Sequence, residues 1–182
     1  MGNPGARYAG TRHNIGCRVV ERLAERWHAA LTDRRDTFEG GAARIGDAAV
    51  YLAIPRVYMN LSGQAARALS NKMGRMAENL IVVHDDVDLP LGRVRLKIGG
   101  GDGGQKGVRS IAQMLGDRDF YRVKVGVGRP DELTDMSDHV LSRFTPDEAK
   151  AAEAAVECAA DAVELMVRED FLTAQNRIHT AC

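Results

Sequence analysis

The 182-residue sequence lacks the features of a membrane-spanning or an exported protein. No apolar run approaches the roughly 20 residues that a membrane-spanning helix requires. No charged segment followed by an apolar stretch and small residues opens the chain, so no signal peptide is expected. Neither sign of charge predominates, because Lys and Arg number 25 and Asp and Glu also number 25. We therefore expect a soluble, cytoplasmic protein.

Cysteine is scarce, and the three that occur are far apart: Cys17, Cys158 and Cys182. No CxxC pair is present, and we interpret all three as reduced thiols of a cytosolic protein. The sequence also lacks the GxSxG nucleophile elbow, the HExxH zinc motif and a complete phosphate-binding P-loop. The hydrolase and nucleotide-binding classes that depend on those motifs are therefore excluded.

The composition is that of one folded domain. Hydrophobic residues make up 45% and charged residues 27%, which is ordinary for a globular protein. A chain of this length buries roughly 70% of the surface that it exposes when unfolded. No repeat, low-complexity stretch or linker interrupts it, so residues 1–182 are expected to form a single domain.

Charge is unevenly distributed along the chain. Residues 93–129 contain nine Lys or Arg against three acidic residues, an excess of six positive charges. Residues 131–170 contain twelve acidic residues against three basic ones, an excess of nine negative charges. The first segment could bind a polyanion that the second repels, or the two segments could neutralise each other, and both alternatives stay open.

Helical and strand patterns alternate, which predicts an α/β fold with a mixed, mostly parallel sheet flanked by helices. Apolar residues at helical spacing predict helices over 15–27, 65–73, 108–115 and 146–168. Strands are predicted over 38–45, 50–54, 80–83, 94–98 and 122–127. Gly46 and Asp47 read as a hairpin turn between the first two strands.

The ends of the predicted helices carry recognisable signals. Thr145 is the expected N-cap of the last helix and Pro146 its first residue. Glu148, three residues after Thr145, completes a capping box. Asn14 is the expected cap of the first helix, and Gly74 closes the second.

Two strands are expected to have a basic face, because apolar and basic residues alternate along them. In one, Val94, Leu96 and Ile98 alternate with Arg93, Arg95 and Lys97; in the other, Val123, Val125 and Val127 alternate with Arg122 and Lys124. The run 80–83 is apolar throughout, which suits a strand buried on both faces.

His13 precedes the first predicted helix and is a candidate general base, since imidazole titrates near neutral pH. Such a base needs an acceptor on its other ring nitrogen, and Asp85, Asp86 and Asp88 follow the buried strand as candidates. A structural cap or surface histidine, and turn-forming aspartates, are the structural alternatives.

Two other interpretations involve a bound group. His84, Asp85, Asp86 and Asp88 resemble a metal-binding set by composition, but neighbours on one strand point to opposite faces. The spacing Gly99-x-Gly101-x-x-Gly104 matches the dinucleotide fingerprint by letter, but no acidic residue ends a strand about 20 residues later. The glycines indicate either close backbone approach to another group or a flexible loop.

The motifs, taken in order, resemble the bacterial-type peptidyl-tRNA hydrolase family. The matching segments are Gly2–Gly5 with Tyr8, Thr11–Gly16, Tyr58–Gly63, His84–Gly92, Gly99–Gly104 and Val125–Pro130. The resemblance extends almost from Met1 to Ala174–Arg177. It implies a monomer that hydrolyses the ester between peptide and tRNA, without metal or cofactor. A catalytically weakened RNA-binding paralogue, with no turnover, is the alternative.

The resemblance also implies roles for individual residues. His13 matches the base that activates water, Asp85 its supporting carboxylate, and Asn60 an amide that holds substrate and the developing oxyanion. Asn3 matches the residue that helps distinguish N-blocked peptidyl-tRNA from aminoacyl-tRNA. The remaining matches are the substrate-contacting Tyr8 and Tyr58 and the acceptor-stem phosphate contacts Arg95, Lys97 and Lys124.

Two departures from the family pattern stand out. Gln105 and Lys106 occupy positions where the family usually has His and Asn, so we hypothesise reduced or altered hydrolysis that Lys106→Asn would raise. The family also has a hydrophobic first strand before the Asn3-Pro4-Gly5 turn, of which Met1 would be among the last residues. We therefore expect a truncated first strand and a true start upstream of Met1.

Overall fold

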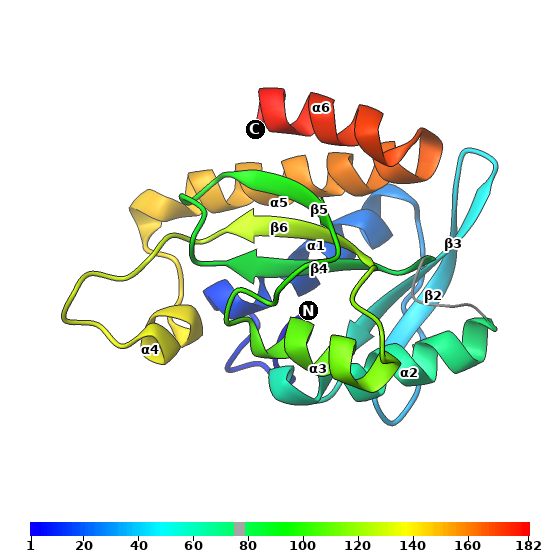
Figure 1. The fold of residues 1–182 in the computed structure, drawn as a ribbon, viewed down its shortest axis with the longest axis horizontal. Coiled ribbons are helices and arrows are strands. Elements are labelled where there is room, and N and C mark those ends of the chain that lie inside the picture. The colour runs from blue at the N-terminus through cyan, green and yellow to red at the C-terminus, as the bar shows by residue number, and fades with distance from the viewer. Residues whose placement is uncertain (75–78) are drawn as a thin grey trace.

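The computed structural model describes residues 1–74 and 79–182, where six α-helices surround two three-stranded sheets (Figure 1). The helices are α1 (Ile15–Arg26), α2 (Ser62–Met73), α3 (Lys106–Leu115), α4 (Met136–Leu141), α5 (Pro146–Arg168) and α6 (Phe171–Ala181). Two 3-10 helices, η1 (Arg12–Asn14) and η2 (Met59–Leu61), precede α1 and α2. The strands are β1 (Asp33–Arg34), β2 (Phe38–Ile45), β3 (Ala48–Pro55), β4 (Ile81–Asp86), β5 (Val94–Ile98) and β6 (Tyr121–Gly126).

The first sheet is antiparallel, in the order β1-β2-β3. Its β2–β3 hairpin closes with Ile45 opposite Ala48, and Gly46 at the turn has a φ of +58°. This left-handed conformation favours glycine, since a Cβ would be strained there. The predicted hairpin turn at Gly46 and Asp47 is therefore confirmed.

The second sheet has the order β4-β6-β5, with β4 parallel to β6 and β5 antiparallel to β6. The α/β class is confirmed, but the expected mostly parallel sheet is wrong for the described strands, where β4–β6 is the one parallel pair. The cause is the short connection 87–93, which turns the chain back without the crossover that parallel strands require. The segment containing α3 then returns the chain, so that β6 lies between β4 and β5.

Helices cover both faces of the second sheet: α1 and α5 lie behind it in Figure 1, α6 lies along its β5 edge, and α2 and α3 lie on the side of β4. Small residues on α5 are completely buried, which lets this helix pack closely against α1 and the sheet: Ala152, Ala155, Ala159, Ala160 and Ala162. A second, smaller core lies against α2 and α3 and includes Met59, Val82, Val108, Ile111 and Phe120.

The helix-end predictions mostly hold. Thr145 and Glu148 form the capping box of α5, and Gly74 ends α2 in a left-handed conformation. Asn14 occupies the N-cap position of α1 as predicted, but its side chain makes no capping hydrogen bond. That side chain instead accepts from Asn3 N at 2.9 Å and donates to Asn3 O at 2.9 Å, which fixes the N-terminal turn.

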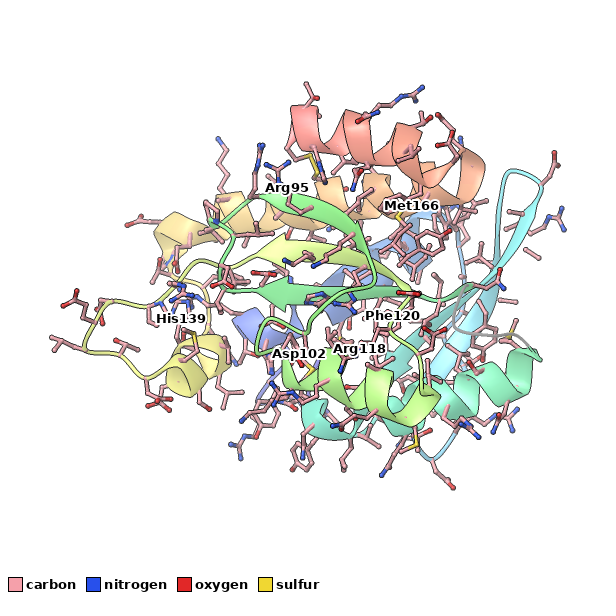
Figure 2. The ribbon with its side chains drawn as sticks, viewed as in Figure 1. Arg95, Asp102, Arg118, Phe120, His139 and Met166 are labelled. Atoms are coloured by element: carbon pink, nitrogen blue, oxygen red, sulfur yellow. A yellow bond between two sulfur atoms is a disulfide. The ribbon has the colours of Figure 1, made fainter. Side chains whose placement is uncertain are left out.

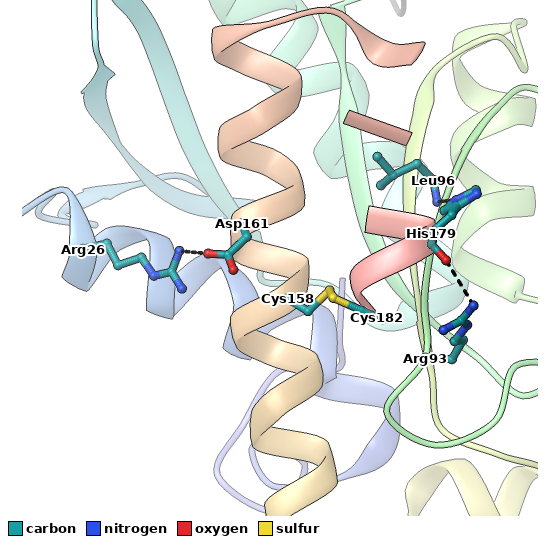
Figure 3. Close-up of a disulfide and its surroundings, with 7 residues drawn as sticks. All are labelled: Arg26, Arg93, Leu96, Cys158, Asp161, His179 and Cys182. Carbon is teal, nitrogen blue, oxygen red and sulfur yellow. Dashed lines mark hydrogen bonds and ion pairs between the residues drawn. A yellow bond between two sulfur atoms is a disulfide. The ribbon is translucent and has the colours of Figure 1, made fainter. Parts of the chain in front are cut away.

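Cys158 on α5 and Cys182 after α6 form a disulfide (Figure 3). The expectation of three reduced thiols is therefore wrong for this pair, while Cys17 is free and buried. The two cysteines are 24 residues apart in sequence, but α6 packs back against α5 and brings their Cα atoms to 6.6 Å. Sequence spacing alone does not reveal such a helix–helix contact.

Acidic residues of segment 131–170 form ion pairs with arginines of α1. Arg18, Arg22 and Arg26 lie one turn apart on α1 and form ion pairs with acidic residues of α5: Glu153, Glu157, Asp161 and Glu164. Within the described residues, no ion pair joins segment 93–129 to segment 131–170. The two segments therefore do not neutralise each other through ion pairs.

Within residues 1–74 and 79–182, no helix combines the length and apolarity needed to cross a membrane.

Candidate active site

His13 and Asp85, which are 72 positions apart in sequence, are in direct contact. The Nδ1 atom of His13, on η1, lies 2.8 Å from Oδ2 of Asp85, near the carboxyl end of β4. The Asp85 side chain is 3% exposed and the His13 side chain 13% exposed. A carboxylate can only accept, so Nδ1 carries the proton and Nε2 keeps its lone pair. The arrangement holds an imidazole that can accept a proton at Nε2.

Arg12 fixes the main chain beside His13. Its guanidinium is buried and donates two hydrogen bonds to Glu148, at 2.7 and 2.6 Å. A further bond, of 2.8 Å, reaches Ser142 Oγ. Because Glu148 also belongs to the α5 capping box, η1 is anchored to the start of a long helix.

The other two aspartates considered as partners of His13 have different contacts. Asp86 forms an ion pair of 2.6 Å with Lys124, and Asp88 one of 2.6 Å with Arg129. Among residues 1–74 and 79–182, no group of three or more His, Cys, Asp or Glu side chains has the arrangement of a metal site.

His84 is buried and separate from this chemistry. Its Nδ1 lies 2.7 Å from the main-chain oxygen of Asp85, which can only accept, so Nδ1 carries the proton. Burial lowers the pKa of His84 to about 4, and its Nε2 has no hydrogen-bond partner in the described structure. His84 is therefore a neutral structural residue at pH 7.

Asn3 connects the N-terminal turn to η2. Its Oδ1 accepts a hydrogen bond of 2.8 Å from Met59 N, the residue before Asn60. The side chain of Asn60 is exposed. Asn3 is thus close to the segment that carries Asn60, as expected if both contact one substrate.

Tyr8 and Tyr58 pack edge to face, with ring centroids 6.4 Å apart and planes at 88°. Tyr58 lies two residues before Asn60 and is 55% exposed, which is unusual for a large aromatic side chain. The guanidinium of Arg7 lies 4.5 Å from the Tyr8 ring centroid. The two tyrosines form an accessible aromatic surface next to η2.

The predicted phosphate-binding residues lie on adjacent strands. Arg95 of β5, labelled in Figure 2, is the register partner of Lys124 of β6, and Lys97 is the partner of Arg122. Lys97 is exposed, and Arg95 and Lys124 are half-buried. Lys124 is ion-paired with Asp86, the residue after Asp85, which places this end of β6 next to the His13–Asp85 pair.

Arg122 holds the glycine-rich loop. It is buried and donates to Gly101 O at 2.7 Å and to Gly100 O at 3.0 Å. Positive φ angles occur at Gly99, Gly100, Gly103 and Gly104. The glycine density therefore reflects left-handed backbone, with Arg122 bound to two of the loop's carbonyls.

The sequence did not identify Gln105 as part of the site. Its Nε2 donates to Oδ1 of Asp85 at 2.6 Å, so both oxygens of this carboxylate are bonded. The available signal was its place between the glycine-rich loop and α3, where a polar cap is common. Lys106, the first residue of α3, is exposed.

A family model described as peptidyl-tRNA hydrolase matches residues 1–182. Peptidyl-tRNA hydrolase of Mycobacterium tuberculosis is 45% identical over 180 residues, covering 98% of this chain and 94% of the relative. That of Frankia casuarinae is 45% identical over 179 residues, covering 98% and 91%. The crystal structure of peptidyl-tRNA hydrolase from Acinetobacter baumannii superposes with a TM-score of 0.90 at 35% identity, covering 98% of this chain and 91% of the other.

Proposed function

Because this chain belongs to the peptidyl-tRNA hydrolase family, we propose that it hydrolyses the ester between a peptide and the 3′ ribose of tRNA. The observation that carries the proposal is the 2.8 Å contact between His13 Nδ1 and Asp85. It leaves Nε2 as the proton acceptor, which is the state that a general base requires.

His13 Nε2 takes a proton from water, and the water oxygen attacks the ester carbonyl. The Asn60 amide donates to the oxyanion that develops in the tetrahedral intermediate. When the intermediate collapses, the bond to the ribose oxygen breaks and the protonated imidazole returns its proton to that oxygen. The products are a peptide with a free carboxyl group and tRNA.

Asn3, Tyr8 and Tyr58 are assigned to substrate binding. Asn3 is held by Asn14 and by Met59 N, so its amide has a fixed position beside Asn60. We assign it to recognition of N-blocked peptide. The paired tyrosine rings offer an apolar surface to the 3′ end of the substrate.

Arg95, Lys97 and Lys124 are assigned to the phosphates of the acceptor stem. Phosphate contacts position a nucleic acid without reading its sequence, which suits an enzyme that serves many tRNAs. The acidic residues of α5 are paired with α1, which reduces their repulsion of the RNA. This supports the first of the two alternatives for the basic segment, the binding of a polyanion.

The proposed enzyme acts as a cytoplasmic monomer without an obligate partner, metal or cofactor. The alternative of an RNA-binding protein without turnover is not favoured, because the His13–Asp85 pair is intact and the family match covers the whole chain.

The test is single-turnover release of N-acetyl-aminoacyl groups from tRNA by the purified chain, with and without a chelator. We expect cleavage at the same rate in both. Salt-sensitive tRNA binding without cleavage would instead indicate the RNA-binding alternative. Cleavage that the chelator abolishes would indicate a metal-dependent enzyme.

A further inference from the structure

Gln105 connects the carboxylate of Asp85 to the N-terminus of α3. Its Nε2 donates to Asp85 Oδ1 at 2.6 Å. Its Oε1 accepts from Gly107 N at 2.6 Å and from Val108 N at 3.3 Å, which caps α3. Gln105 is 9% exposed and Asp85 3%, so these bonds are shielded from water.

The chemistry of the partners fixes the orientation of the Gln105 amide. Main-chain N–H groups can only donate, so they must face the amide oxygen. The Asp85 carboxylate accepts, so it must face the amide nitrogen. A flipped amide would place its N–H group against the N–H donors of Gly107 and Val108, and its oxygen against the Asp85 carboxylate, so this side chain has one acceptable orientation.

Gly107 provides the space for this contact. A Cβ at Gly107 would lie 3.0 Å from Gln105 Oε1 and 2.5 Å from Met59 Sδ. The latter distance is too short for real atoms, so a larger residue would displace Met59 and press on Gln105. Glycine at this position therefore lets the main chain of α3 approach the amide without displacing Met59.

A continuous set of hydrogen bonds results, from the α3 N-terminus through Gln105 to Asp85 and on to His13. Asp85 has one oxygen bonded to each neighbour, so its carboxyl plane cannot rotate without losing a bond. Rotation of Asp85 would release the proton on His13 Nδ1 and allow the other tautomer, in which Nε2 is protonated and cannot act as a base.

We propose that Gln105 is a positioning residue for the hydrolysis, an inference that rests on the function proposed above. It fixes the rotation of Asp85 and thereby keeps His13 in the tautomer whose Nε2 accepts a proton from water. Gln105 acts through Asp85 and His13 rather than on the reacting atoms.

Two variants separate this role from helix capping. Gln105→Asn shortens the side chain and loses the reach to Asp85, but asparagine is itself a strongly preferred cap. Gln105→Glu keeps the length and the cap but offers no N–H donor to Asp85. Gln105→Asn is expected to keep the unfolding temperature within a few degrees of the parent, whereas Gln105→Glu is expected to lower it, because it buries a second carboxylate beside Asp85. Gln113→Asn, at an exposed position on α3, serves as the matched control.

We expect kcat to fall roughly 10- to 100-fold in both variants, the usual cost of losing a residue that orients a reactive group, with KM and tRNA affinity unchanged. The nitrogen NMR shifts of the His13 ring should show the Nδ1–H tautomer in the parent and a mixture in Gln105→Asn. An unchanged kcat together with an unchanged tautomer would overturn the proposal. If the parent itself cleaves nothing, the proposed function fails, and the His13 ring shifts still decide whether Gln105 sets the tautomer.

Discussion

His84 precedes Asp85 on β4, and its buried ring makes the stability of the protein depend on pH. Burial lowers its pKa to about 4 in the folded state, whereas an exposed histidine has a value near 6.5. As pH falls below about 6.5, the unfolded chain binds a proton that folded His84 does not. Folding stability is therefore lost between about pH 6.5 and pH 4, in total on the order of 3 kcal/mol.

A variant without this ring tests the pH dependence. We expect the free energy of unfolding of the parent to fall about 2 kcal/mol more than that of His84→Met between about pH 6.5 and pH 5. Urea unfolding at both pH values measures this difference, and the other titrating groups cancel in the comparison. Parallel losses in the two proteins would contradict the neutral assignment of His84.

Lys106 places a positive charge at the first residue of α3, next to Gln105. The N-terminus of a helix already carries partial positive charge, so a cation there is unfavourable by about 0.3–1 kcal/mol. Lysine also lacks the acceptor that the family's asparagine provides. We expect Lys106→Asn to raise turnover of peptidyl-tRNA, while Lys150→Asn, at an exposed position on α5, leaves it unchanged. No change, or a loss, in Lys106→Asn would contradict this.

At the scale of elements, α6 protects the outer edge of the sheet that carries the basic strands. His179 Nε2 accepts from Leu96 N at 2.9 Å (Figure 3), and Gln175 donates to Leu96 O at 3.0 Å. Burial, then Arg95 and Arg93, lower the pKa of His179, which keeps Nε2 free to accept. These bonds occupy main-chain groups of an edge strand that would otherwise be open to association.

The Cys158–Cys182 disulfide fastens α6 to α5 and should contribute to stability. For cysteines 24 residues apart, loop entropy predicts about 3 kcal/mol. We expect Cys158→Ser to lower the free energy of unfolding by about this amount under oxidising conditions and to have little effect with reductant present. Alkylation of the unfolded, unreduced parent should modify Cys17 alone, whereas three modified cysteines would show that the disulfide is absent.

The sequence predicted the elements whose apolar pattern is strong or whose ends carry clear signals. The α5 capping box and the β2–β3 turn are both local features, and both were correct. By contrast, α4 has no buried residue and α6 has only two, Ala174 and Ile178, so neither has a strong apolar stripe. The disulfide and the mixed strand directions depend on tertiary packing, which local patterns do not encode.

The site was predicted in part, for a similar reason. His13 was identified as a candidate base from its residue type and position, but Asp85, Asp86 and Asp88 were equivalent by local pattern. Family resemblance selected Asp85, and the structure brings it to His13. Gln105 was missed as a site residue because an amide next to a glycine-rich loop has many possible roles until its partners are known.

At the scale of the whole molecule, charge is separated between two surfaces. The α1–α5 ion pairs hold acidic residues on one side, and the β5–β6 strands present Arg95, Lys97 and Lys124 on another. Each basic residue that contacts a phosphate releases counterions, so affinity depends on salt. We propose that these basic residues bind the polyanionic substrate, with Lys124 exchanging its ion pair with Asp86 for a phosphate.

Removing one basic residue should reduce both affinity and salt dependence. We expect Lys97→Ala to weaken tRNA binding and to lower the slope of log Kd against log salt concentration by about 1. Arg44→Ala, at an exposed position on β2, should leave both unchanged. Binding measured from low to moderate salt tests this, and equal effects of the two substitutions would argue against a contact at Lys97.

The most direct test of the account is the single-turnover rate of His13→Ala, measured with tRNA affinity in parallel. Loss of a general base predicts a roughly 100- to 10,000-fold slower release of the peptidyl group, with tRNA affinity unchanged. Cleavage within a few-fold of the parent rate, at saturating enzyme, would contradict the assignment of His13 as the base.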